Sequence, residues 1–327
     1  MTIKISVVMA AYNAADFISE TIDSIINQKF TEWELICVND GSTDKSLEIL
    51  EYYASLDKRI TVFNIPNSGA LNARNFGVEK SKGEWLYIMD ADDKMSTDML
   101  EEMHSTALSE NADFILPDQI HWFPHNEIET FSFNEKFGTF PNISSRDAFL
   151  KYLKWEIHGR GMMKTNQYRE HSFNYDRFFI DEFINRKVVL NCKKVAFSKG
   201  EYIYRQNDES LIYKVSKRRF DVLERSRMSE DLLVQNFDDA KVIADFRNER
   251  LQEIYGLLIL FLKQKKQFAT QDSIAILKII EDAYKKLDKR GVREMFFNSG
   301  IIGKLKSILL CSNWILFKYT TIILNKK

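Results

Sequence analysis

An apolar strand that ends in a cluster of acids is the feature that most constrains this chain. Residues 85–89 form an apolar run, bounded by Gly83 on one side and by Asp90, Asp92 and Asp93 on the other. Short apolar runs with such boundaries are typical of strands covered on both faces of a sheet. The acids therefore follow the carboxyl end of a strand, which is the edge where open α/β sheets bind ligands.

The acidic cluster has two interpretations. Crowded carboxylates repel one another unless a cation or hydrogen-bond donors offset their charge, and Asp90 and Asp92 together suit an oxygen-preferring Mg²⁺ or Mn²⁺. Alternatively, the cluster is a polar turn in which Asp93 or Ser96 caps the next helix. The Asp-X-Asp pattern alone does not decide between the two.

Strand and helix patterns alternate over the first part of the chain. Apolar strand patterns at 3–10, 33–38, 60–65 and 85–89 are separated by helical patterns at 17–26, 42–56 and 71–80. This alternation predicts an α/β fold with a mostly parallel, doubly wound sheet. The sequence contains neither G-x-G-x-x-G nor G-x-x-x-x-G-K-[ST], so the two commonest nucleotide-binding fingerprints are excluded.

Polar residues follow several of these strands at the same predicted edge. Tyr12 and Asn13 follow the first strand, and Asp40 ends the second. Tyr12 could stack on a base and Asp40 could accept a hydrogen bond from it. Taken singly, Tyr12 is better explained as a rim residue packed on the first helix, and Asp40 as a carboxylate that holds its own turn. Together with Asp90 and Asp92 they favour a binding site, because a core needs no acids at the ends of two strands on one edge.

Composition restricts the class of partner. Lys+Arg 46 against Asp+Glu 47 gives a formal net charge of -1, which does not predict a nucleic-acid binder. The cysteines Cys37, Cys192 and Cys311 lack metal-ligand spacing and favour reduced thiols. The first residues run into a strand pattern without the features of a secretion signal. We therefore expect a cytoplasmic protein.

Five ordered motifs resemble family 2 glycosyltransferases of the GT-A fold. Their order and spacing match as well as their residues, over about the first 215 positions. Ala10 is a departure, because the family usually has Pro there. The motifs lie at 6–13, 38–44, 67–69 with 73–75, 83–85 and 90–93.

This resemblance implies roles for residues at the sheet edge. Tyr12 and Asp40 would contact the nucleotide base, and Arg74 would neutralise phosphate charge. Asp92 would ligate the Mn²⁺ or Mg²⁺ that holds the diphosphate, with Asp90 in the ribose or metal region as a second candidate ligand. The nucleotide-sugar-binding residues would be Ala11, Tyr12, Asn13, Asp40, Arg74, Asp90, Ala91 and Asp92.

The resemblance also implies a general base near residue 181. The family has a Glu-Asp pair three residues before an apolar position, and its Asp is the base. Aligning on Ile184 and Lys187 makes Asp181 the base and puts Ile180 where the family has Glu. A slip of one residue would make Glu182 the base instead. Two acids at the beginning of a helix are also favoured by the helix dipole alone, by ~0.3–1 kcal/mol.

The implied reaction is a metal-dependent, inverting transfer of one sugar. The donor would be a nucleotide sugar, a UDP-sugar, and the acceptor a hydroxyl of a saccharide or lipid-linked saccharide in capsule or lipopolysaccharide synthesis. The Gln-x-x-Arg-Trp motif of processive members does not occur. A pyrophosphorylase loop is also missing, which disfavours a nucleotidyltransferase. The alternative is a non-catalytic nucleotide-sugar-binding partner of a glycan assembly complex, which the Ile180 departure keeps open. His158 and Arg160 would lie near the acceptor or diphosphate, or in a packed or solvent-facing loop.

The chain is expected to divide near residue 215. We predict a GT-A domain at 1–215, with a nucleotide-sugar half at 1–100 and an acceptor half at 101–215, in which 119–142 is irregular. A helical region would follow at 216–327. In its tail, 300–327, apolar residues alternate with lysines. Such a tail suits a helix in an anionic membrane interface, or a helix docked on the domain or on another subunit of a homo-oligomer.

Overall fold

The structure is a computed structural model that describes residues 2–123, 128–133, 136, 142–170, 180–206, 216–289 and 313–324. The chain forms two compact units, of which the first comprises Met1–Asp176 and Ile184–Ser210 and the second Arg177–Phe183 and Leu211–Lys327. Three predicted features lie wholly or partly outside the described residues: much of the stretch 119–142, the boundary at 215, and the parts of the tail at 300–312 and 325–327.

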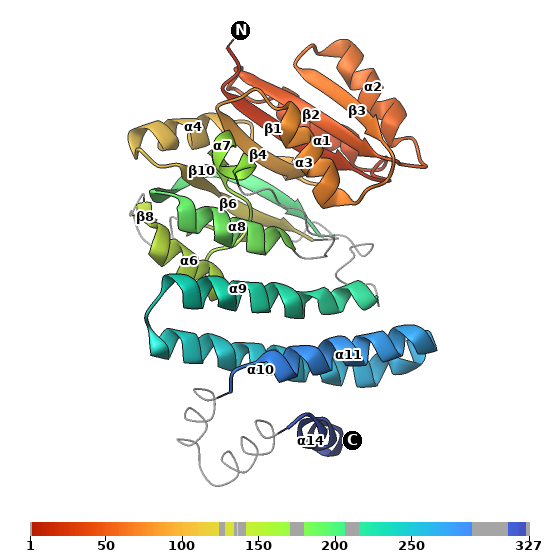
Figure 1. The fold of residues 1–327 in the computed structure, drawn as a ribbon. Helices are drawn as coiled ribbons and strands as arrows, with labels where there is room; N and C mark the ends of the chain where they lie inside the picture. Colours follow the sequence, from red (N-terminus) through yellow and green to blue (C-terminus); the bar gives the residue numbers. More distant parts are fainter. Residues whose placement is uncertain are drawn as a thin grey trace. The chain divides into compact units, whose positions relative to one another are not determined.

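The first unit begins with the predicted alternation of strands and helices. The β1 strand pairs in parallel with β2 and β4, and β2 pairs in parallel with β3. Three helices lie beside these strands (Figure 1). A β-carbon on Gly77 of α3 would lie 2.5 Å from Val8, so this helix packs closely on β1. The elements are β1 (Ile5–Ala11), α1 (Ile18–Ile26), β2 (Trp33–Asp40), α2 (Ser46–Leu56), β3 (Ile60–Ile65), α3 (Ala70–Lys80) and β4 (Trp85–Asp90).

The second part of this unit extends the same sheet. Over the described residues the sheet has ten strands, in the order β3-β2-β1-β4-β9-β6-β10-β5, with β7 paired to β6 and β8 to β10. The β10 strand lies parallel to β6, with a register shift between Phe197 and Glu201. The elements are β5 (Lys94–Met95), α4 (Met99–Ser109), β6 (Phe114–Trp122), β7 (Ile128–Phe131), β8 (Asn142–Ser144), α6 (Ser145–Leu153), β9 (Met162–Lys164), α7 (Thr165–Arg169), α8 (Ile180–Asn191) and β10 (Lys194–Arg205).

The prediction of an irregular stretch at 119–142 is wrong at 119–122 and 128–131, which lie in strands, and at Asn142, where β8 begins. The β6 strand continues through Trp122, and β7 pairs with it in antiparallel register, with Ile120 opposite Thr130 and Trp122 opposite Ile128. Because Ile120 and Trp122 alternate with polar residues, the segment has the period of a strand. The phenylalanines and histidines nearby hid this alternation.

The second unit contains a bundle of helices. The helices α9, α10 and α11 pack side by side, and α14 packs on α10 and α11 (Figure 1). Buried residues such as Leu258, Phe261 and Ile280 form its core, so the apolar run at 257–262 is a core face. In the described parts of the chain we find no helix with the length and apolar character needed to cross a membrane. The elements are η2 (Lys217–Asp221), α9 (Val222–Asn236), α10 (Ala240–Gln264), η3 (Lys265–Gln267), α11 (Thr270–Lys286) and α14 (Trp314–Leu324).

Candidate active site

Asp40 joins the end of β2 to the beginning of α3. Its carboxylate is buried, and it accepts hydrogen bonds from the backbone N–H of Ser68 at 2.7 Å and of Gly69 at 2.9 Å. Gly41 follows with φ +70°, where a β-carbon would lie 2.7 Å from the Asn67 nitrogen. The carboxylate therefore holds the neighbouring turn as well as its own strand end. A carboxylate has about four acceptor positions, so a further donor can still be accommodated.

The turn after β1 lies next to Asp40. In the sheet Ala11 stands opposite Asn39, which brings the residues that follow these two strands together. Asn13 adopts φ 51°, and its side-chain oxygen accepts from the Thr43 backbone N–H at 2.8 Å. Tyr12 has 54% of its surface exposed, so its ring is available to a ligand. Ala11 is buried and can contact a ligand through its backbone.

Asp90 lies between two guanidinium groups. Arg74 of α3 binds one of its oxygens at 2.6 Å, and Arg160, from the loop before β9, binds the other at 2.6 Å. Burial alone would raise the pKa of Asp90, but the charges of Arg160 and Arg74 hold it well below its usual range. The two guanidinium groups together carry one more charge than the Asp90 carboxylate that they bind. Arg160 thus contacts the acidic loop, which its neighbourhood in the sequence did not reveal.

Asp92 differs from Asp90 in its electrostatic surroundings. Burial and the nearby charge of Asp90 raise the pKa of Asp92, so a cation beside it would favour its ionised form. The carbonyl of the preceding Ala91 is held by the Thr21 hydroxyl at 2.9 Å.

These surroundings test whether a divalent ion fits. Within the described residues no group of three or more His, Cys, Asp or Glu side chains is placed to hold a metal ion. Asp92 suits a single protein ligand, with the remaining ligands supplied by phosphate oxygens. Both oxygens of Asp90 bind guanidinium groups. The second ligand role for Asp90 stays a prediction, and it would require one oxygen to leave its arginine.

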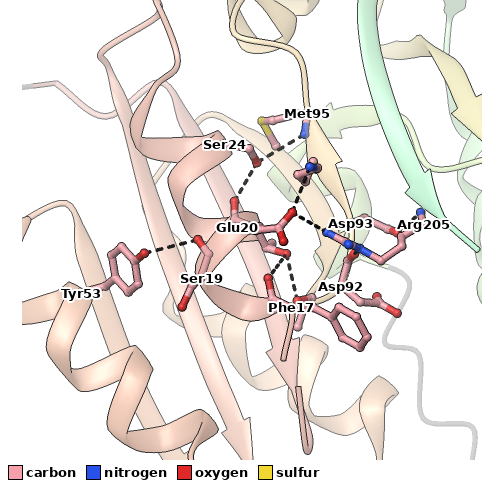
Figure 2. Close-up of polar contacts among 12 residues, drawn as sticks. Phe17, Ser19, Glu20, Ser24, Tyr53, Asp92, Asp93, Met95 and Arg205 are labelled. Carbon is pink, nitrogen blue, oxygen red and sulfur yellow. Dashed lines mark hydrogen bonds and ion pairs between the residues drawn. The ribbon is translucent and has the colours of Figure 1, made fainter. Parts of the chain in front are cut away.

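Arg205 at the end of β10 ties the acidic loop to α1. It donates from Nε to the Asp92 carbonyl at 2.9 Å and from Nη2 to Glu20 at 2.8 Å (Figure 2). Its backbone N–H donates to Asp93 at 2.8 Å, and the Tyr202 hydroxyl donates to the same carboxyl. Burial, followed by the charges of Asp90 and Asp92, raises the pKa of Asp93 well above its usual range.

The capping role considered for Asp93 and Ser96 is wrong, because α4 begins after Asp98. Asp93 is fully buried instead, and it bonds to β10.

His158 packs against aromatic rings beside Arg160. Its ring centroid lies 5.6 Å from that of Phe133 and 5.9 Å from that of His121. Burial lowers the pKa of His158 to about 4. The imidazole is therefore neutral at neutral pH.

Asp181 and Glu182 both lie in the first turn of α8, within the second unit. Each is half-buried. Glu182 forms an ion pair with Arg225 of α9. Ile180, where a family Glu would stand, is buried with 3% of its surface exposed.

Comparisons with known proteins agree with this arrangement. Residues 6–178, more than half of the chain, match the family model described as glycosyl transferase family 2. Glycosyltransferase GlyA of Streptococcus pneumoniae serotype 4 is 28% identical over 221 residues, which are 64% of this chain and 31% of that protein. The uncharacterized glycosyltransferase EpsJ of Bacillus subtilis (strain 168) is 37% identical over 220 residues, 63% of this chain and 62% of that protein. The chain thus spans less than two thirds of either relative.

A solved structure gives a likeness of fold. The crystal structure of S. aureus TarS 1-349 in complex with UDP-GlcNAc has a TM-score of 0.68 and 17% identity to this chain. The match covers 94% of this chain and 90% of that one.

Proposed function

Since this chain belongs to glycosyl transferase family 2, we propose that it transfers a single sugar from a UDP-sugar to a hydroxyl of a saccharide or lipid-linked saccharide in bacterial surface glycan synthesis. One observation carries the proposal: Tyr12, Asp40 and Asp92 follow neighbouring parallel strands at one edge of the sheet. These side chains combine an aromatic face, a buried acceptor and a metal-binding carboxylate, which are the groups that a nucleoside diphosphate needs.

The positive charge around Asp90 supports the binding of a diphosphate. Arg74 and Arg160 approach its carboxylate from different parts of the chain. Because their charges exceed that of Asp90, an anionic leaving group is stabilised beside them. In this proposal Tyr12 stacks on the base, and Asp40 accepts a hydrogen bond from it.

A divalent ion would be held by Asp92 and the donor's phosphate oxygens. When bound, it would supply positive charge to the diphosphate as negative charge develops there. The contribution of the protein is to keep Asp92 in place, which Arg205 does by binding its carbonyl.

Asp181 is the proposed general base. As the acceptor oxygen bonds to the sugar C1 and the bond from C1 to the diphosphate breaks, the hydroxyl proton passes to the Asp181 carboxylate. The nucleoside diphosphate leaves, and direct displacement inverts the anomeric carbon. Glu182 is the less favoured base, because its carboxylate already pairs with Arg225.

The test is a panel of nucleotide sugars, assayed with and without Mn²⁺ for release of nucleoside diphosphate in the presence of saccharide acceptors. We expect metal-dependent release from one UDP-sugar. Binding of UDP without release from any donor and acceptor would favour the non-catalytic alternative. The absence of both binding and release would contradict the proposal.

The outer face of α14 supports peripheral attachment to an anionic membrane, which we include in the proposal. Phe317 is buried and stacks on Tyr284 at 4.4 Å, whereas Ile315, Leu316 and Tyr319 are exposed. Residues 295–327 contain five lysines and no aspartate or glutamate. An apolar face within an acid-free, basic segment suits anionic lipid.

This attachment can be tested by sedimentation with vesicles. We expect the protein to bind phosphatidylglycerol vesicles better than phosphatidylcholine vesicles, and to lose binding when Ile315, Leu316 and Tyr319 are changed to Ser. Phe317 stays intact in this variant, so the core of the unit is kept. Equal sedimentation of both proteins would contradict the attachment, and a dimer lost in the variant would assign the face to a second copy.

A further inference from the structure

The proposed base lies on a segment that the helical unit holds. Residues Arg177–Phe183 group with Leu211–Lys327 in the second unit rather than with the sheet. Within that unit the described beginning of α8 contacts α9 through Glu182 and Arg225. The acid next to the proposed base is therefore bonded to a helix of the second unit.

The Arg225 side chain is held by α10 as well as by Glu182. Its side chain has 7% of its surface exposed, and its other nitrogen lies 3.4 Å from Glu253 of α10. The second oxygen of Glu253 accepts from the Ser226 hydroxyl at 2.5 Å. Glu253, which Ser226 holds, thus binds one nitrogen of the guanidinium group, and the other nitrogen binds Glu182. A planar, oriented fork restricts a carboxylate more than a flexible ammonium would.

Restraining Glu182 also restrains Asp181. Neighbouring residues on a helix differ by about 100° around its axis, so their side chains point in different directions. When Arg225 holds Glu182, the rotation of the first turn of α8 is set, and with it the direction of Asp181. The same ion pair offsets the charge of the carboxylate beside the base.

We propose that Arg225 is a positioning residue for the transfer reaction, which acts through Glu182 to hold Asp181 in place. The proposal rests on the proposed function of Asp181. It assigns the helical unit a part in the reaction, because that unit supplies the group that orients the base.

The test compares Arg225→Gln with Arg227→Gln, a matched control on the same helix. Arg227 pairs with Glu224 at 2.9 Å and Asp231 at 2.5 Å, both on α9. We expect Arg225→Gln to lower kcat by about 10–100-fold, the cost of a small misplacement of a catalytic group, with an unchanged KM for the donor. Arg227→Gln should match wild type in both constants.

A double variant separates positioning from a general loss of structure. If Arg225 acts through Glu182, then Glu182→Gln also lowers kcat. The kcat of the double variant should then be no lower than that of the less active single variant. Glu182 is half-buried at a helix end, so this variant keeps the fold. The proposal would be overturned if the loss of kcat in the double variant equalled the product of the two single losses. It would also be overturned if Arg225→Gln lowered kcat no more than Arg227→Gln does.

Hydrogen exchange supplies a readout that does not depend on turnover. Full-length Arg225→Gln should exchange the amides at the beginning of α8 faster than Arg227→Gln, while α11 is unchanged. Equal exchange there would overturn the proposal even if no donor were turned over. Conversely, if Asp181→Asn kept wild-type turnover, the assignment of the base would fail, and the exchange result would still report whether Arg225 holds the turn.

Discussion

Asp40 and Asp93 at the edge of the sheet are held by a different kind of partner from Glu182 of the helical unit. Asp40 and Asp93 accept from backbone N–H groups, those of Ser68 and Gly69 for the first and that of Arg205 for the second. Glu182 instead pairs with the side chain of an arginine. The backbone donors belong to the turn before α3 and to the end of β10, whereas an ion pair depends on the rotamers of two long side chains. Asp40 and Asp93 are thus held by the backbone, whereas Glu182, like Asp90 with its two arginines, depends on side chains that a single substitution can remove.

The largest effect should come from removing the base without disturbing the edge. Asp181→Asn should lower kcat by about 10²–10⁴-fold, because the acceptor hydroxyl loses its proton acceptor. UDP affinity, measured by calorimetry, should not change. Asp98→Asn, at a half-buried position before α4 in the first unit, is the control. Wild-type turnover in the Asp181 variant would remove it as the base.

A substitution at the edge of the sheet should instead weaken the binding of UDP. Asp92→Ala should weaken UDP binding in the presence of Mn²⁺ by about 10–100-fold, the size expected for the loss of one charged ligand. Without the metal the two proteins should bind UDP equally. The measurement is a calorimetric titration with and without Mn²⁺. An affinity that does not depend on the metal in either protein would contradict the ligand assignment.

Stability should distinguish backbone-held acids from ion-paired ones. Asp40→Asn should lower the free energy of unfolding by about 1–3 kcal/mol, since it presents an amide to buried N–H donors. Glu182→Gln should cost less, because 30% of the Glu182 side chain is exposed to solvent. Urea denaturation of both variants checks this order, and a larger loss for Glu182→Gln would reverse the comparison.

The smallest effect concerns pH within the first unit. The pKa of His158 is lowered from 6.5 to about 4 by burial. As pH falls from 6.5 towards 4, the unfolded chain binds a proton that the folded chain excludes, so the free energy of unfolding decreases. His158→Gln should remove this part of the decrease, and urea denaturation at pH 7 and pH 5 measures it. Parallel pH dependence in both proteins would contradict a neutral His158.

Asp90 should follow a different pH dependence. Its arginines lower its pKa, so its stabilising contribution persists in the range where His158 already costs stability. That contribution is lost only as pH falls below the ordinary range of carboxyl groups.

The sequence predicted the first half of the sheet and the family, and both are confirmed. Strand ends and turn residues between 10 and 93 were readable because strand alternation and turn chemistry are local. Arg160 and Arg205 were not readable as partners of the acidic loop. They lie 70 residues from Asp90 and 113 residues from Asp92 in the chain, and they arrive through β9 and β10, whose positions depend on antiparallel pairing and a register shift. The ion pair between Glu182 and Arg225 of α9 was likewise not readable from the sequence, and the choice between Asp181 and Glu182 stays a prediction.

The bonds from Tyr202 and Arg205 to the acidic loop also bear on the order of synthesis. The strands β1 to β4 emerge from the ribosome first and can pair with one another, but the carboxyl of Asp93 acquires its partners only when β10 has been made. Contacts between such distant positions form slowly. A nascent chain that stops short of residue 205 would therefore hold a paired sheet whose acidic loop still lacks its partners from β10. If Asp92 binds the donor as proposed, such a chain would not yet compete for nucleotide sugar.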